Sequence, residues 1–290
     1  MPLRRIALVV NPHSRGVRRA AIEATAAFLA QHIDTSLVWT TGPGDATIQA
    51  ARLGADPDTL VTACGGDGTV FEVLNGLPPQ GVLGLLPAGT ANVIARELGI
   101  PLAWREAAKA LLTGAVRTFD TGRWNDRRFF MVAGCEFDAH VAAAVPRLPK
   151  RWLGQYAYHL ETLRRYPTYA PPRLRVEIDG QTTVEGAFVL FANLRRYGGG
   201  LFFAQGARPD DGRLDLVALR RLSLPFLVKG LWGAWTRRGV GSDIAHRCQG
   251  RSFLLRSSRP VRVQLDGEVL EPVTEARITV EPASLRLVAP

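Results

Sequence analysis

Apolar positions in the first 115 residues form short runs that are separated by segments of helical spacing. The runs at 5–10, 36–41, 59–64 and 82–89 are rich in Val, Leu and Ile and predict buried strands. The segments between and after them predict helices, with Asp45 as the N-cap of the second, at residues 18–32, 45–55, 68–77, 90–99 and 105–114. Strands that alternate with helices in this way predict an α/β domain with a mostly parallel sheet.

The pattern changes after about residue 116, where apolar and polar residues alternate in short runs bounded by Gly, Pro, Asp or Ser. Such runs predict antiparallel strands of a β-sandwich, at residues 127–141, 173–180, 182–194, 212–220, 251–258, 261–270 and 276–290. Two interruptions, at 148–168 and 223–239, predict helices. We therefore predict an α/β domain over 1–118 and a β-sandwich domain over 119–280, with a tail of about 281–290 that can return to the first. The cleft between two domains is the default position for a site.

Composition narrows the class of protein. The formal net charge of +10 favours a polyanionic partner, which is a nucleic acid, an anionic membrane surface or phosphate groups. The three cysteines stand singly, without CxxC spacing, so the sequence implies neither a zinc site nor a disulfide framework and fits a reducing compartment. No run reaches the ~18 apolar residues of a membrane span. We expect a cytoplasmic protein that visits a membrane surface.

A glycine-rich turn follows the third predicted strand and opens a helix. Gly65, Gly66 and Gly68 let main-chain N–H groups approach a phosphate, and the helix N-terminus adds partial positive charge. Asp67 would repel that phosphate unless a cation were bound as well, which points to Mg²⁺. The turn is neither a Walker A loop nor GxGxxG, since position 71 is Phe. The simpler interpretation is a plain β-turn with Asp67 as a turn former.

Two other strand ends carry short polar side chains. Asn11 and Ser14 follow the first strand, and Thr90 and Asn92 follow the fourth, beside Gly89. Thr90 alone is equally well explained as the N-cap of the next helix. The carboxyl ends of the strands are the usual position for ligand contacts in an open α/β sheet, so the three ends together predict one nucleotide site.

These motifs resemble the diacylglycerol kinase catalytic-domain family, especially its soluble bacterial lipid kinases. The resemblance rests on "NPHSRG" (11–16), "CGGDGTVFEVLNGL" (64–77), "GLLPAGTANVIARELGIP" (84–101), "PDDGRLDL" (209–216) and "LDGE" (265–268), which occur in the family's order. The GGDGT element alone is shared with NAD kinases and sphingosine kinases. The resemblance implies ATP and Mg²⁺ as cofactors, nucleotide bound by the α/β domain, and a lipid hydroxyl phosphorylated at the cleft.

The resemblance also assigns nucleotide-binding positions in the α/β domain. These are Asn11, Pro12, His13, Ser14, Arg15, Gly65, Gly66, Asp67, Gly68, Thr69, Glu72 and Thr90. A further threonine is Thr40, with Thr41 as the alternative. Arg15 departs from the family, which usually has Ser-Gly directly, so this loop is a residue longer or differently shaped.

In the β domain the resemblance implies a structural Mg²⁺ at the carboxylate of Asp211 and the main-chain carbonyls of Arg208 and Arg213. The alternative is a plain Asp-Gly hairpin turn. It also implies Glu268 as the general base that accepts the hydroxyl proton, with Asp67 and Mg²⁺ neutralising phosphate charge. Asp266, beside it, either orients Glu268 or binds metal indirectly.

Two stretches, 147–166 and 224–239, mix basic and aromatic residues. Phe226, Leu227, Leu231, Trp232 and Trp235 suit one helix face. The simpler interpretation packs that face on the β domain, and the alternative docks it on a membrane interface.

The predicted function is an ATP-dependent lipid kinase, with diacylglycerol as the first candidate acceptor. Phosphatidylglycerol, a sphingoid base and ceramide remain open. The alternatives are an NAD kinase-like enzyme with a soluble acceptor and a non-catalytic lipid- or nucleotide-binding regulator. We expect no nucleic-acid partner, because the chain has no reading motif. A homodimer is left open.

Overall fold

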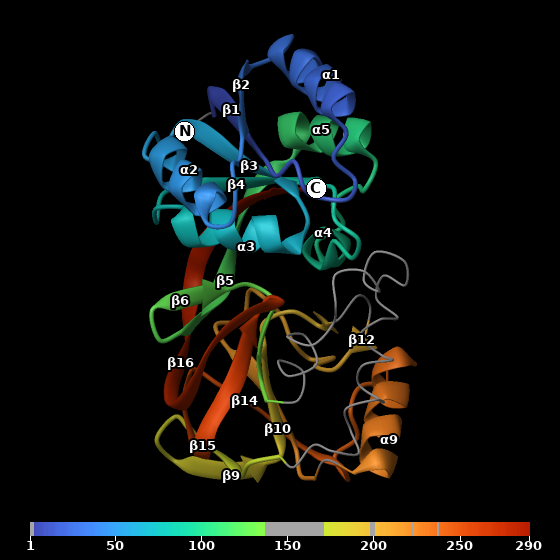
Figure 1. Cartoon of the computed structure of the whole chain (residues 1–290), viewed down its shortest axis with the longest axis vertical. Helices are drawn as coiled ribbons and strands as arrows, with labels where there is room; N and C mark the ends of the chain where they lie inside the picture. Colours follow the sequence, from blue (N-terminus) through green and yellow to red (C-terminus); the bar gives the residue numbers. More distant parts are fainter. Residues whose placement is uncertain (1–2, 137–170, 198–200, 222, 237) are drawn as a thin grey trace. The chain divides into compact units, whose positions relative to one another are not determined.

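A computed structural model describes residues 3–136, 171–197, 201–221, 223–236 and 238–290. The chain divides into two compact units, the first made of 1–119 with 283–290 and the second of 120–282 (Figure 1). The second predicted basic-aromatic stretch is described in part, and the first, 147–166, lies outside the described residues.

Strands β1 to β4 and the end of β16 form a parallel sheet in the first unit. Its order is β2-β1-β3-β4, followed by the last residues of β16, which join β4 at Arg286 and Leu287. The strands are β1 (Arg5–Val10), β2 (Asp34–Trp39), β3 (Thr59–Gly65), β4 (Val82–Pro87) and β16 (Glu268–Ala289). Strand β3 is buried along its whole length, as a central parallel strand requires.

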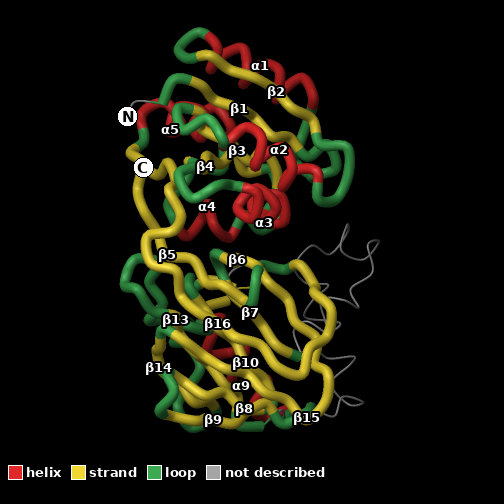
Figure 2. The backbone as a smooth tube through the Cα atoms, turned by 90° about the vertical axis from the view of Figure 1, so that its left-hand side faces the viewer, coloured by secondary structure: helices red, strands yellow, loops and turns green. Residues whose placement is uncertain are grey.

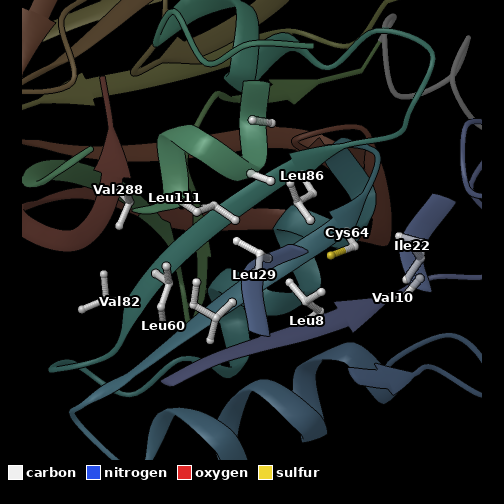
Figure 3. Packing of buried hydrophobic residues seen from close by; sticks show 13 residues of the cluster. Leu8, Val10, Ile22, Leu29, Leu60, Cys64, Val82, Leu86, Leu111 and Val288 are labelled. Atoms are coloured by element: carbon white, nitrogen blue, oxygen red, sulfur yellow. The ribbon is translucent and has the colours of Figure 1, made fainter. Parts of the chain in front are cut away.

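Helices cover both faces of this sheet, as the alternating pattern predicts. They are α1 (Arg19–Ala30), α2 (Asp45–Gly54), α3 (Asp67–Gly76), α4 (Val93–Glu97) and α5 (Trp104–Thr113). Helices α1 and α5 pack together, and α2 packs on α3. Figure 3 shows the core in which Ile22 and Leu29 of α1 and Leu111 of α5 meet Leu8, Leu60 and Leu86 of the strands.

The second unit is a β-sandwich of antiparallel strands. One path runs β14-β13-β10-β7-β15-β16, while β8 pairs with β15 and β9, and β5 pairs with β6. The strands are β5 (Ala115–Trp124), β6 (Arg127–Phe129), β7 (Val132–Cys135), β8 (Leu174–Ile178), β9 (Thr182–Gly186), β10 (Phe188–Ala192), β11 (Arg196–Tyr197), β12 (Leu201–Phe202), β13 (Leu214–Leu219), β14 (Ala245–Gly250) and β15 (Ser252–Leu265). In Figure 2, which draws the backbone as a tube, the strands of this unit are the yellow stretches, among them β7, β10, β13 and β15.

Strand β15 pairs with two different strands along its length, in addition to β16. Its first half pairs with β8 and its second half with β7, and the register shifts between Arg256 and Val263. Bulges of this kind bend a strand. Buried aromatic rings fill the interior, where Phe191 meets Phe253 edge-on with ring centroids 5.1 Å apart. The predicted fold class, α/β followed by a β-sandwich, is confirmed.

Some predicted details were wrong. Helix α2 has Gly44 as its N-cap, in the left-handed region (φ 83°), because Asp45 already has helical backbone. The fourth helix spans only Val93–Glu97 instead of 90–99, and its N-cap is Asn92 (φ 47°) rather than Thr90. The sequence pattern also missed β5 and β14, which carry few apolar residues.

Candidate active site

The loops that follow β1, β3 and β4 meet at the carboxyl edge of the parallel sheet. Main-chain hydrogen bonds join them: Asn11 N–H to Cys64 O (3.1 Å), Gly16 N–H to Ala88 O (2.8 Å) and Ala88 N–H to Gly65 O (2.7 Å). In the order β2-β1-β3-β4, the chain continues from β1 to a neighbour on one side and from β3 to a neighbour on the other side, so the strand order reverses between β1 and β3. Such a switch point is where doubly wound sheets bind ligands.

Two of the glycines are required by contact between the loops. A Cβ atom on Gly89 would lie 2.5 Å from the Cα of Gly66, and one on Gly65 would lie 2.3 Å from Thr69 Oγ1. Gly66 itself has φ −91°, so closeness rather than a left-handed backbone demands glycine there. The glycine-rich turn is therefore a packed junction between two loops, which leaves only main-chain groups at its surface.

Asn11 holds the first loop against this junction. Its Nδ2 donates to Thr69 Oγ1 (3.2 Å), and its Oδ1 accepts from the N–H of His13 (2.9 Å). Ser14 belongs to the same group, since its Oγ lies 3.0 Å from the position of a Gly65 Cβ. The structure thus brings Asn11, Ser14, Gly65 and Thr69 together, as the sequence predicts for one site.

The Asp67 carboxylate lies between the N-termini of α3 and α4. Its Oδ1 accepts from Ile94 N–H at 3.4 Å. Burial raises the pKa of Asp67, and the N–H groups of Val93, Ile94 and Asn92 oppose that rise. A half-buried carboxylate that faces helix N-termini is placed to share a cation with a bound phosphate.

Glu72 and Thr41 make bonds inside the unit. Glu72 Oε2 accepts from Ala46 N–H (3.2 Å), which braces α3 against the start of α2. Thr41 donates its N–H (2.7 Å) and its hydroxyl (3.0 Å) to Asp45 Oδ2, and these bonds lower the pKa of Asp45. Thr40, the preferred of the two threonines, is buried and hydrogen-bonded through its N–H to Val10 O.

Four predicted nucleotide-binding residues lie at the surface of this edge: Pro12, His13, Arg15 and Thr90 are exposed. Asn92 closes the loop beneath Thr90, because its amide group both accepts from Gly89 N–H (2.8 Å) and donates to Gly89 O (3.0 Å). The sequence places Asn92 at one of the three strand ends of the predicted site but does not predict a contact for it. A side-chain amide bonded to both main-chain groups of Gly89 fixes the loop that packs on Gly66.

In the second unit, Asp266 is a buried anchor. Its carboxylate accepts three main-chain N–H groups, from Phe130 (2.7 Å), Met131 (2.8 Å) and Val132 (2.9 Å). Asp266 and Gly267 form a two-residue hairpin turn with φ 51° and 96°, which joins β15 to β16. Glu268 is the next residue and is exposed. Asp266 thus fixes the turn that carries Glu268.

The predicted metal segment forms a turn before β13. Asp211 Oδ1 accepts from Arg213 N–H (3.0 Å), and the buried Asp120 accepts from Gly212 N–H (2.7 Å). Burial raises the pKa of Asp215, and the charge of Asp211 adds to that rise, so two carboxylates lie near each other. Within the described ranges no group of three or more His, Cys, Asp or Glu residues is placed to hold a metal ion. A metal here would depend on Asp211 and main-chain oxygens.

A cavity of about 690 Å³ lies elsewhere in the first unit. Ile6 and Leu60, near the amino ends of β1 and β3, line it with Val288. The predicted nucleotide site is at the opposite, carboxyl ends of these strands, so this cavity is not that site. Among the described residues, no helix is both long and apolar enough to cross a membrane.

An open α/β unit whose loops meet at a glycine-built junction, followed by a β-sandwich, defines the architecture of this two-unit protein. Residues 5–124 match the diacylglycerol kinase catalytic domain, and residues 131–289 match the YegS C-terminal NAD kinase beta sandwich-like domain. The chain therefore belongs to the diacylglycerol kinase family, as its motifs predict.

Individual relatives agree with this assignment. The chain is 32% identical over 244 residues to a diacylglycerol kinase of Bacillus subtilis (strain 168), covering 81% of this chain and 79% of that one. It is 30% identical over 266 residues to a probable lipid kinase YegS-like of Chromohalobacter salexigens, covering 89% and 84%. A crystal structure of a diacylglycerol kinase from Bacillus anthracis str. Sterne superposes with a TM-score of 0.75 at 22% identity, covering 99% and 97%, which shows the shared fold.

Proposed function

We propose that this protein transfers the γ-phosphate of ATP to the hydroxyl of a membrane lipid, with diacylglycerol as acceptor and phosphatidic acid as product. The observation that carries the proposal is the junction of Gly65, Gly66 and Gly89 at the switch point of the parallel sheet. Side chains are excluded there, because a Cβ atom on any of the three would lie 2.3–3.1 Å from its nearest neighbour, so phosphate oxygens can approach the main-chain N–H groups at the start of α3. The relatives named diacylglycerol kinase support the choice of acceptor.

In this proposal, residues of the first unit bind the phosphates of ATP. Asn11, Ser14 and Thr69 hold the loop that binds the phosphates. Asp67 and a bound Mg²⁺ would neutralise charge on the β and γ oxygens. Asp67 fits that role because its carboxylate is held by N–H groups at the start of α4, close to the glycine junction.

Glu268 supplies the base in this proposal. As the acceptor oxygen forms its bond to the γ-phosphorus, the bond from that phosphorus to the ADP oxygen breaks, and the hydroxyl proton passes to the Glu268 carboxylate. Glu268 is exposed, and the buried carboxylate of Asp266 holds the turn that carries it. Asp211, with carbonyl oxygens of Arg208 and Arg213, is proposed as a structural Mg²⁺ site of the second unit.

The test is transfer of radiolabelled γ-phosphate from ATP into a bacterial lipid extract, compared between wild type, Glu268→Gln and Glu271→Gln. Glu271 is an exposed glutamate of the same strand and serves as the matched control. We expect Glu268→Gln to lower the rate by about 100-fold or more, while ATP binding is kept and Glu271→Gln remains near wild type.

The identity of the labelled lipid then names the acceptor and separates diacylglycerol from phosphatidylglycerol, sphingoid bases and ceramide. Label in NADP instead of lipid, with NAD as acceptor, would replace the proposal by an NAD kinase-like activity. Binding of ATP and lipid without any transfer would indicate a non-catalytic regulator.

A further inference from the structure

Helix α9 (Leu224–Trp235) turns its small residues inward. Gly230 and Ala234 are buried, and Ala234 is fully so. Gly233, on the same side, is so close to the following segment that a Cβ atom would lie 2.3 Å from Gly239 O. Residues spaced by three and four positions share one helix face, so a face of small residues makes the contact with the unit.

Large apolar side chains occupy the solvent-facing side instead. Val228, Trp232 and Trp235 follow one another at spacings of four and three residues and are 54%, 59% and 67% exposed. The two indole rings lie against each other with centroids 5.3 Å apart. The simpler interpretation of the sequence, in which Trp232 and Trp235 pack on the β-sandwich, is therefore wrong. Exposed aromatic clusters of this kind mark interaction surfaces.

The sequence segment that contains this helix is strongly basic. No Asp or Glu occurs between Asp215 and Asp243, whereas that stretch holds Arg220, Arg221, Lys229, Arg237 and Arg238. Arg220, Arg221, Lys229 and Arg238 are exposed, and Lys229 pairs with Asp243. A second copy of the chain docked on the same face would set these cations against one another. The charge favours an anionic partner.

We propose that the face of α9 formed by Val228, Trp232 and Trp235 docks on the interface of a bilayer that contains anionic phospholipid. Tryptophan is enriched at membrane interfaces, where its ring sits at headgroup depth, and the flanking arginines attract acidic headgroups. The helix has 12 residues and lies on the membrane rather than crossing it. This inference rests on the proposed function, since it supplies the contact that a kinase needs to reach a lipid embedded in a bilayer.

The first experiment measures binding without ATP. The full chain is sedimented with vesicles of phosphatidylcholine alone, or with phosphatidylglycerol added, and the bound fraction gives an apparent Kd. The variants are Trp232→Ser/Trp235→Ser and Arg220→Gln/Arg221→Gln. Ile48→Ser removes an equally exposed apolar residue from α2 and serves as the control (66% exposed).

We expect the double tryptophan variant to bind both kinds of vesicle about tenfold or more weakly. The double arginine variant should lose about fivefold per arginine on anionic vesicles only. Ile48→Ser should bind like wild type. Because both tryptophans are exposed, thermal unfolding should show that their replacement leaves the fold intact. Equal binding of wild type and the double tryptophan variant would overturn the proposal, as would a dimer that this variant abolishes.

A second experiment separates this inference from the proposed function. Transfer rates are measured with long-chain diacylglycerol in vesicles and with a short-chain diacylglycerol dissolved in water. The double tryptophan variant should lose about tenfold on vesicles and keep wild-type activity on the dissolved acceptor. A loss of equal size on both acceptors would overturn membrane docking. If the wild type transferred phosphate to neither acceptor, the kinase proposal would be wrong, while the result of the vesicle-binding experiment would still hold.

Discussion

The buried carboxylate of Asp266 offers the sharpest test of how the second unit positions Glu268. It accepts N–H groups from three consecutive residues at 2.7–2.9 Å, and all three lie in the interior. Asp266→Ala leaves these donors without that acceptor and places alanine at φ 51°, a left-handed conformation that it adopts poorly. If each of the three N–H groups that lose their acceptor costs about 1–1.5 kcal/mol, the lower part of the usual range, and the left-handed alanine costs about 1–1.5 kcal/mol, the total loss is about 4–6 kcal/mol.

Asp266→Asn keeps part of this arrangement. Its amide oxygen can still accept from Met131 and Val132, and asparagine tolerates the left-handed backbone, but its NH₂ group would face the N–H of Phe130. We therefore expect a loss of about 1–3 kcal/mol. Asp179 is a matched control, because it also precedes a glycine in a hairpin (φ 50°) and accepts two N–H groups, yet it is exposed. Asp179→Ala should cost only about 1–2 kcal/mol.

The assay is urea unfolding followed by tryptophan fluorescence, to which Trp124, buried in the second unit against Phe191, contributes. With an m-value of about 2 kcal/mol per molar urea, the midpoint should fall by about 2–3 M for Asp266→Ala and about 1 M for Asp266→Asn. If Asp266→Ala shifts the midpoint no more than Asp179→Ala does, the three buried N–H groups do not depend on this carboxylate, and the reasoning fails.

Three further predictions concern the phosphate loop and the metal segment. Gly89→Ala should lower the free energy of unfolding by about 1–3 kcal/mol and weaken ATP binding, because its Cβ would lie 2.5 Å from Gly66 Cα. Gly42→Ala, whose Cβ would have nothing within 4 Å, should change neither the urea unfolding curve nor the ATP titration. Asp67→Asn should abolish transfer yet raise the urea midpoint at pH 7. Burial raises the pKa of Asp67 in the folded chain above its ordinary value of 3.8. Between 3.8 and the raised pKa the folded state therefore binds a proton that the unfolded state releases, so the stability of the wild type falls as the pH rises through this range. Below pH 3.8 the wild type and Asp67→Asn should be equally stable. A stability gain that persists at the lowest pH would contradict this. Mg²⁺ at saturation should raise the melting temperature of the wild type by about 5 °C and that of Asp210→Asn equally, but not that of Asp211→Asn; an equal rise in all three would place the ion elsewhere.

Much of the first unit could be predicted because its strands are short apolar runs. Residues 5–10 form β1 as predicted, since a strand buried on both faces cannot alternate with polar residues. The convergence of Asn11, Asp67 and Gly89 also follows from sequence, because the carboxyl ends of parallel strands share one edge. Contact between Gly66 and Gly89 could not be predicted, because it depends on how two loops 23 positions apart pack in space.

The second unit was harder to predict for a physical reason. Strand β14 (Ala245–Gly250) pairs on one side with β13, and its interior residues His246, Arg247 and Gln249 are not buried, so no apolar run marks it. The role of Asp266 depends on N–H groups more than 130 positions earlier in the chain. On α9, the sequence shows which residues are apolar, but the tight approach of Gly233 to Gly239 decides which face turns inward.

The last strand has a consequence for how the protein is made. Arg286 and Leu287 pair with β4, and Leu287 and Val288 are buried in the first unit. During synthesis from the N-terminus, β4 of the first unit therefore lacks this partner strand until Arg286 and Leu287 have been made. The second unit is one continuous segment, 120–282, and is complete earlier. The second unit can therefore fold first, and the sheet of the first unit is completed only when residues 286–287 are available to pair with β4.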